Sequence, residues 1–225
     1  MGNDIASLIK EKGYWLLKDP DVGARADQFL KPRIDTQSVE ALKLAKIYIL
    51  DNKQNEDIID AIFDEPVIVF YRGFGQTKRV HCFRNNVLFP IAPNTLMMVF
   101  GFCSTASKIL LCESSHLYPQ GATNAPNGVL GIPDETLERL IAAGEVQVRE
   151  ESFEQGGYII SDGRIGWKVL QGKTAFLGIM EIREARNHNW VEMDLPRTEE
   201  HINIVETMKA KNKTLCANFR WLESA

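Results

Sequence analysis

Arg72 lies at the end of an apolar run in the segment 66–73 of the sequence. The run from Pro66 to Phe70 is followed directly by Tyr71, Arg72 and Gly73. Burying an unpaired guanidinium is costly, so Arg72 must meet an anionic ligand, a protein carboxylate or the surface. The fork of a guanidinium also matches the geometry of phosphate and carboxylate oxygens. The segment therefore predicts that Arg72 holds an anion, supplied either by a ligand or by a neighbouring acid.

A second polar pair follows the next long apolar run, where Ser104 and Thr105 come after Phe102 and Cys103. Together with the Arg72 segment, this pair resembles the first two motifs of the R-S-E class of ADP-ribosyltransferases. The resemblance implies that Arg72 binds NAD by its phosphates and that Ser104 and Thr105 brace the site. It also implies that a glutamate on a late strand, Glu181, stabilises the transition state.

The chain departs from that family in two places. The third motif reads Glu181-Ile-Arg-Glu184 in place of a Glu-x-Glu or Gln-x-Glu pair, and strands are predicted between the first two motifs where the family has a helix. The structural alternative is an edge-strand arginine beside an acid, followed by an ordinary Ser/Thr turn.

Basic and aromatic residues alternate around the same arginine. The candidate ligand-binding residues are Tyr71, Lys78, Arg79 and Arg84, and a further basic segment runs from Lys209 to Arg220. Aromatic rings within a cationic groove suit stacking on nucleic-acid bases. Nucleic-acid binding or processing is therefore an alternative function, and a non-catalytic protein-interaction module is another. A nucleotide-like small molecule or a nucleic acid is the expected partner, with NAD the cofactor that the resemblance implies.

The cysteines and histidines point to no defined centre. Cys82, Cys103, Cys112 and Cys216 lack zinc-ligand spacing, so no metal site is predicted and reduced core thiols are expected. Pairing of Cys103 with Cys112 across a hairpin is the alternative. Cys216 lies near Arg220 and could favour a thiolate, but the sequence places no histidine beside it.

The totals describe an ordinary globular chain. The 225 residues carry a formal charge of -4 and a pI of about 5.7, so any binding of a phosphate backbone would need a local basic patch. No stretch reaches the ~18 apolar residues of a membrane-spanning helix. We expect a cytoplasmic protein without a membrane segment.

Periodicity divides the chain into helices and strands. Helical spacing is found near residues 5–12, 39–50, 56–63, 133–144 and 198–208, and strand patterns at 67–72, 78–83, 87–91, 95–102, 108–113, 145–149, 157–161, 164–170 and 174–184. Leu96 to Phe102 is apolar on both faces, which is typical of a central strand. Asp162-Gly163 predicts a tight hairpin turn.

These elements predict an α+β fold in which N-terminal helices pack on a largely antiparallel, curved sheet and a helix follows late in the chain. We expect one domain over residues 1–225. The turn-rich segment 119–131 is the place where a boundary between two lobes, or a lid, would fall.

Overall fold

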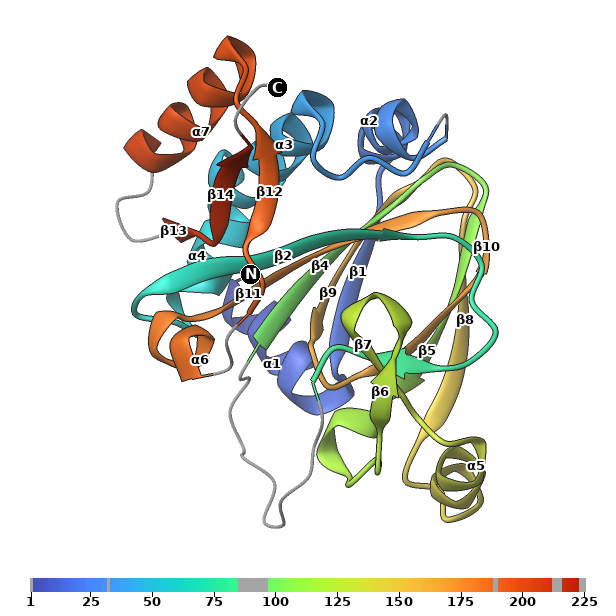
Figure 1. Cartoon of the computed structure of the whole chain (residues 1–225). Coiled ribbons are helices and arrows are strands. Elements are labelled where there is room, and N and C mark those ends of the chain that lie inside the picture. Colours follow the sequence, from blue (N-terminus) through green and yellow to red (C-terminus); the bar gives the residue numbers. More distant parts are fainter. Residues whose placement is uncertain (1, 32, 85–96, 188–189, 212–215, 223–225) are drawn as a thin grey trace.

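The computed structural model describes residues 2–31, 33–84, 97–187, 190–211 and 216–222 (Figure 1). It is a mixed α+β structure with mostly antiparallel sheets, as predicted. Within these described ranges, the strands form two six-stranded sheets and one two-stranded sheet. No helix of the described residues is long and apolar enough to cross a membrane.

The first sheet has the order β1-β9-β4-β11-β2-β13. Its strands are β1 (Tyr14–Lys18), β9 (Gly157–Asp162), β4 (Met97–Cys103), β11 (Thr174–Glu181), β2 (Pro66–Phe74) and β13 (Cys216–Ala217). All pairs are antiparallel except β13 with β2. The central strand β4 is buried along its whole length, which confirms the prediction for residues 96–102.

The second sheet has the order β6-β7-β3-β10-β5-β8. Its strands are β6 (Thr123–Ala125), β7 (Val129–Gly131), β3 (His81–Cys82), β10 (Gly166–Gln171), β5 (Ser107–Glu113) and β8 (Gln147–Phe153). From β8 to β11, successive strands alternate between the two sheets, which is the arrangement of a jelly roll. The chain thus builds a sandwich, where the sequence predicted a single sheet.

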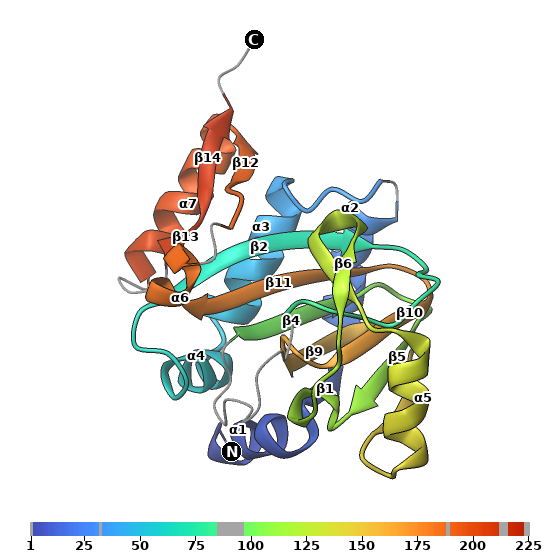
Figure 2. The ribbon, with the colours of Figure 1, turned by 60° about the horizontal axis from the view of Figure 1, so that its bottom comes forward.

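Helices cover the outer face of the first sheet, the face turned away from the second sheet (Figures 1 and 2). They are α1 (Gly2–Lys12), α2 (Pro20–Leu30), α3 (Val39–Ala45), the π-helical turn η1 (Lys46–Leu50) and α4 (Lys53–Asp60). Asp19 caps α2, with Pro20 at its first position, and Ser38 caps α3 through the amide of Ala41. The sequence analysis missed β1 and α2.

The C-terminal part packs beside α3 and against the β2 side of the first sheet. After α6 (Ile182–Asn187), the strands β12 (Met193–Pro196) and β14 (Phe219–Leu222) pair in parallel, and α7 (Glu199–Lys211) lies beside α3 (Figure 1). We call β12, α7, β13 and β14 the C-terminal unit. The helix α5 (Asp134–Ala142) lies at the opposite end of the molecule (Figure 2).

Two turns differ from the prediction. The turn after Asp162 carries the chain from β9 in the first sheet to β10 in the second, so no hairpin forms there. The Asp162 carboxylate instead accepts hydrogen bonds from the amide, Nε and Nη2 of Arg164, a buried ion pair that fixes this crossing. Segment 119–131 contributes β6 and β7 to the second sheet. The predicted strand at 87–91 lies outside the described residues.

Cys103 and Cys112 lie on β4 and β5, in different sheets, and both thiols are free and buried. Burial raises the pKa of each to about 12, so neither is a thiolate near neutral pH. The predicted reduced core thiols are confirmed for these two and for Cys82.

Candidate functional site

A β-bulge in β2 decides which side chains reach the outer face of the first sheet. Gly178 of β11 pairs with Phe70 and Ile179 pairs with Ile68, so Val69 has no partner of its own. Val69 and Phe70 consequently both face the space between the sheets. The extra residue shifts the alternation by one position, and Tyr71 therefore lies on the helix side.

Tyr71 is the polar side chain that the bulge places there. The residue is only 5% exposed, and its hydroxyl has no hydrogen-bond partner among the described residues. Its ring meets Phe29 and Phe102 edge-on, at 6.2 and 6.3 Å between centroids. Burial raises the pKa of the phenol well above 10, so the hydroxyl keeps its proton at any physiological pH.

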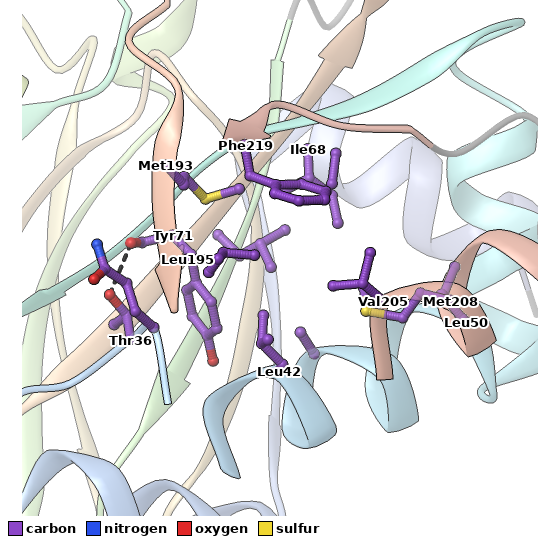
Figure 3. A pocket seen from close by; sticks show the side chains of 14 residues that line it. Thr36, Leu42, Leu50, Ile68, Tyr71, Met193, Leu195, Val205, Met208 and Phe219 are labelled. Carbon is purple, nitrogen blue, oxygen red and sulfur yellow. Dashed lines mark hydrogen bonds between the residues drawn. The ribbon is translucent and has the colours of Figure 1, made fainter. Parts of the chain in front are cut away.

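The Tyr71 side chain lines a pocket of about 40 Å³ between the outer face of the first sheet and the C-terminal unit (Figure 3). Figure 3 shows its hydroxyl end directed toward Leu42 on α3. The other lining residues are Thr36, Gln37, Leu42, Ala45, Leu50, Ile68, Leu177, Met193, Leu195, Val205, Met208, Ala217 and Phe219. None of these described residues carries a charge.

The pocket reaches the surface along one side. Gln37 is exposed, and Thr36, Met193 and Phe219 are half-buried, whereas the lining residues of α3 and β11 are buried. Thr36 is fixed at this rim because its hydroxyl donates a 2.8 Å hydrogen bond to the carbonyl of Tyr71. The rim is therefore the side from which a molecule would enter.

Polar contacts at its two ends attach the C-terminal unit to the rest of the chain. The amide of Asn218 donates to the carbonyl of Ile68 at 2.9 Å. At the other end, Nε2 of His201 lies 3.0 Å from the carbonyl oxygen of Gln37. Between these ends the contact across the pocket is made by apolar side chains, which slide past one another more readily than hydrogen-bonded groups do.

The inner face of the same sheet is filled by aromatic rings. Trp167 lies at the centre, 4.5 to 5.5 Å from the ring centroids of Phe74, His81, Phe83 and Phe176. Phe70 continues this ring cluster by stacking on Phe83 at 4.8 Å and meeting Trp190 at 5.5 Å. The space in which a jelly roll could hold a ligand is occupied here by the protein's own side chains.

Arg72 lies at the mouth of this inner space, with its guanidinium carbon 5.6 Å from the centre of the Phe70 ring. Its Nη1 donates a 2.7 Å hydrogen bond to the carbonyl of Asn127. Gly128, at φ +65°, packs so closely against the guanidinium that a Cβ there would displace the Arg72 side chain. The partner of Arg72 is thus a backbone carbonyl, where the sequence predicted an anion, and burial lowers the pKa of this arginine.

Ser104 and Thr105 have structural partners. The Thr105 hydroxyl and amide both donate to the carboxylate of Asp27 on α2, at 2.8 and 3.0 Å. The Ser104 hydroxyl is 2.8 Å from that of Ser107 and accepts from the amide of Lys173. The pair therefore ties the β4–β5 turn to α2 and to the β10–β11 turn.

Glu181 is distant from these residues. Its carboxylate accepts hydrogen bonds from the amides of Asp64 and Glu65 at the start of β2. Glu181 pairs with Pro66 and Phe176 pairs with Arg72, so six residues of β2, roughly 20 Å of strand, separate the two charged groups. The structure does not bring Arg72 and Glu181 into one site.

The predicted basic and aromatic surface is divided as well. Lys78 and Arg79 are exposed, whereas Arg84 pairs with Glu184 at 3.3 Å and Tyr71 is buried. The rings of Phe74 and Phe83 are packed inside the sandwich, where no base could stack on them. The side chains of Lys209 and Lys211 lie outside the described residues, and so does Lys213. Arg220 is held by Asp194 at 2.5 Å.

Comparison with known proteins gives no family. No protein-family model matches the sequence, and no characterised protein is recognisably similar in sequence. Among solved structures, EctD from S. alaskensis with 2-oxoglutarate and 5-hydroxyectoine is 16% identical, with a TM-score of 0.49 over 79% of this chain and 75% of that one. HygX from Streptomyces hygroscopicus with iron bound is 8% identical, with a TM-score of 0.49 over 85% and 89%.

The epimerase SnoN, in complex with Fe3+, alpha ketoglutarate and nogalamycin RO, is 8% identical, with a TM-score of 0.47 over 80% of this chain and 83% of that one. All of these TM-scores lie below 0.5, so the likeness transfers no chemistry to this chain. It does raise the question whether an iron site of the kind named for HygX and SnoN would fit here.

The described residues do not fit an iron ion. Non-haem iron is held by imidazole and carboxylate ligands with open positions beside them. No three His, Cys, Asp or Glu side chains gather in such a group within the described ranges. Among the described residues, the imidazole between the sheets is that of His81, whose ring lies 5.5 Å from the Trp167 ring at an angle of 36°. The segment 85–96, outside the described residues, contains no His, Cys, Asp or Glu in its sequence.

The resemblance to ADP-ribosyltransferases is wrong, because the Arg72, Ser104–Thr105 and Glu181 motifs do not converge. The expectations of NAD, of a nucleotide-like ligand and of a transferase activity depended on that resemblance, and they are withdrawn with it. Nucleic-acid binding and a protein-interaction module are likewise not supported, because the rings meant to stack are core residues.

Sequence reasoning named Tyr71 but not its surroundings. The lining residues come from seven segments between Thr36 and Phe219, and no local pattern marks them as one wall. One signal was available: Val69-Phe70-Tyr71-Arg72 breaks the strict alternation of a strand, as a bulge does.

Proposed function

We propose that this protein binds a small, uncharged, largely apolar molecule in the pocket lined by Tyr71. The observation that carries the proposal is an open space of about 40 Å³ whose lining residues are apolar except for Thr36, Gln37 and Tyr71. Apolar walls with few polar groups are usual in small-molecule sites.

The dimensions of the pocket limit the ligand. A volume of about 40 Å³ corresponds to a few water molecules, so the closed form holds only a small group. Met193 and Met208 line the side formed by the C-terminal unit. Methionine side chains are unbranched and adapt readily, so their movement would admit a molecule the size of one aromatic ring with a short chain.

Binding can be tested by isothermal titration calorimetry with propylbenzene, a neutral probe that consists of one aromatic ring and a short chain. We expect saturable binding to the native protein. The variant Ala217→Leu should abolish it, because Ala217 lines the pocket and a leucine there fills the space. The exposed helix residue Ala142 offers a matched control, and Ala142→Leu should bind as the wild type does.

The stability of both variants would be measured alongside. Filling a cavity changes stability little or raises it, so loss of binding in a stable Ala217→Leu protein assigns the probe to this pocket. Probe binding that is equal in Ala217→Leu and wild type would refute the proposal.

A further inference from the structure

Within the described lining of the pocket, the polar side chains lie at the rim or are sealed. Gln37 is exposed at the rim, and the half-buried Thr36 uses its hydroxyl on the carbonyl of Tyr71 (Figure 3). The Tyr71 hydroxyl is closed off even from a molecule the size of water, so it is not part of the surface that a ligand would meet. The other eleven lining residues are Leu, Ile, Val, Ala, Met or Phe, and their side chains present carbon and sulfur atoms.

The backbone of the wall is already hydrogen-bonded within the protein. The carbonyl of Ile68 accepts from the amide of Asn218 at 2.9 Å. Leu177 lies on β11, whose two sides pair with β2 and β4, and Leu195 pairs with Trp221 in the ladder of β12 and β14. The main chain of these strands is therefore engaged in the sheets and does not replace the missing polar side chains.

A hydrogen-bonding group carried into this space would lose its water without gaining a partner. Moving a hydroxyl from water into surroundings that cannot hydrogen-bond is far more costly than moving it into surroundings that supply a partner. A space of about 40 Å³ cannot take in the hydrating water together with the ligand. A hydrocarbon has no such loss and gains the burial of its apolar surface.

We infer that the pocket selects hydrocarbons, with alkylbenzenes as the representative class, and excludes ligands that would enclose a hydrogen-bonding group. This inference rests on the proposed function and names the ligand class of the same site. The selection comes from the missing partners in the wall, since a polar ligand and a hydrocarbon of the same shape would touch the same apolar side chains.

Two ligands of nearly equal size test this selection: cumene, an isomer of propylbenzene, and 1-phenylethanol. The alcohol carries a hydroxyl where cumene has a methyl group, at the middle of the molecule, so enclosing the ring and the remaining methyl group also encloses the hydroxyl. The Kd of cumene would be measured by isothermal titration calorimetry, and that of 1-phenylethanol by its displacement of cumene.

The ratio of the two Kd values would be compared with two partition ratios of the same pair, from water into hexadecane and from water into octanol. Octanol supplies hydrogen-bond partners and hexadecane does not, so the two partition ratios differ by roughly 30-fold or more. We expect the Kd ratio to match the hexadecane ratio. The alcohol should then fail to displace cumene at the concentration at which the octanol ratio predicts half displacement.

Tyr71→Phe provides a second measurement, because it removes only the sealed hydroxyl. Circular dichroism and the melting temperature would verify that the variant is folded. We expect the Kd ratio to be the same as in wild type, since the hydroxyl does not face the ligand. A higher ratio in Tyr71→Phe would show that this hydroxyl does bind the alcohol and would overturn the inference.

A Kd ratio in wild type that is closer to the octanol ratio than to the hexadecane ratio would also overturn it. In both cases cumene still binds, and the proposed apolar site stands. If cumene and propylbenzene both failed to bind wild type, the proposed function itself would fail, and the inference with it.

Discussion

The two faces of β2 differ although neighbouring residues supply them. Phe70 points into the sandwich and joins a cluster of rings, whereas Tyr71 points outward into a pocket and leaves its hydroxyl unpartnered. The inner face is closed by the protein's own side chains and provides stability. The outer face has apolar walls that only partly meet, which suits it to bind. In this jelly roll the site is therefore proposed on the helix side of the sheet and not between the sheets.

Removing the central ring of the inner face should have the largest effect. Trp167 is 2% exposed and touches four other rings, so Trp167→Ala should lower the free energy of unfolding by about 3–5 kcal/mol in urea titrations. The outer counterpart is Met193→Ala, at the partly exposed wall of the pocket, where we expect about 1 kcal/mol. Equal losses from the two variants would show that the outer face is as tightly packed as the inner one.

The packing at the β2 bulge can be tested by a substitution in the neighbouring strand β11. A methyl group on Gly178 would collide with the Phe70 ring, so Gly178→Ala should cost about 1–3 kcal/mol. Gly75→Ala is the matched control, since no atom lies within 4 Å of its added carbon, and it should leave stability nearly unchanged.

A second variant locates the strain at Phe70. Adding Phe70→Leu to Gly178→Ala should cost less than the sum of the two single changes, because the smaller side chain makes room for the methyl group. Strict additivity would mean that Gly178 is required for some other reason than the Phe70 ring.

The sequence allowed prediction of the elements with clear periodicity, but not of the way they assemble. Leu96 to Phe102 was recognisable as a central strand because both of its faces are apolar. Asp162-Gly163 looked like a hairpin turn, yet it connects two sheets, and only the long-range pairing of β9 with β4 and of β10 with β5 decides that. The residues that favour a tight turn are the same whether the turn joins two strands of one sheet or two strands of different sheets.

The candidate site was harder to predict for a similar reason. Arg72 was singled out for its charge, and its guanidinium donates to the carbonyl of Asn127, 55 positions later in the chain. Tyr71 is informative because it lacks such a partner. Whether a polar group is satisfied depends on tertiary contacts, which a single sequence does not display.

Loosening the rim of the pocket should have a smaller effect. Thr36→Val removes the hydroxyl that donates to the Tyr71 carbonyl but keeps the shape of the side chain. We expect a loss of about 1 kcal/mol in the free energy of unfolding. Binding of propylbenzene should weaken in the same variant, because Tyr71 and Thr36 both line the pocket. A stability loss with unchanged binding would separate this hydrogen bond from the shape of the site.

The smallest difference expected between the two faces is in their response to pH. Burial is the main cause that lowers the pKa of His81, beside Trp167, and of His116 below the ordinary value of 6.5. As the pH falls through 6.5, the unfolded chain takes up protons before the folded one does, so the free energy of unfolding decreases below that pH.

The pocket contains no group that titrates there, since the Tyr71 phenol stays protonated. Probe affinity of the folded protein should then be constant between about pH 6 and 9, while urea titrations show stability declining at acid pH. His81→Phe should make that decline shallower, and an unchanged slope would assign it to His116 or to other groups.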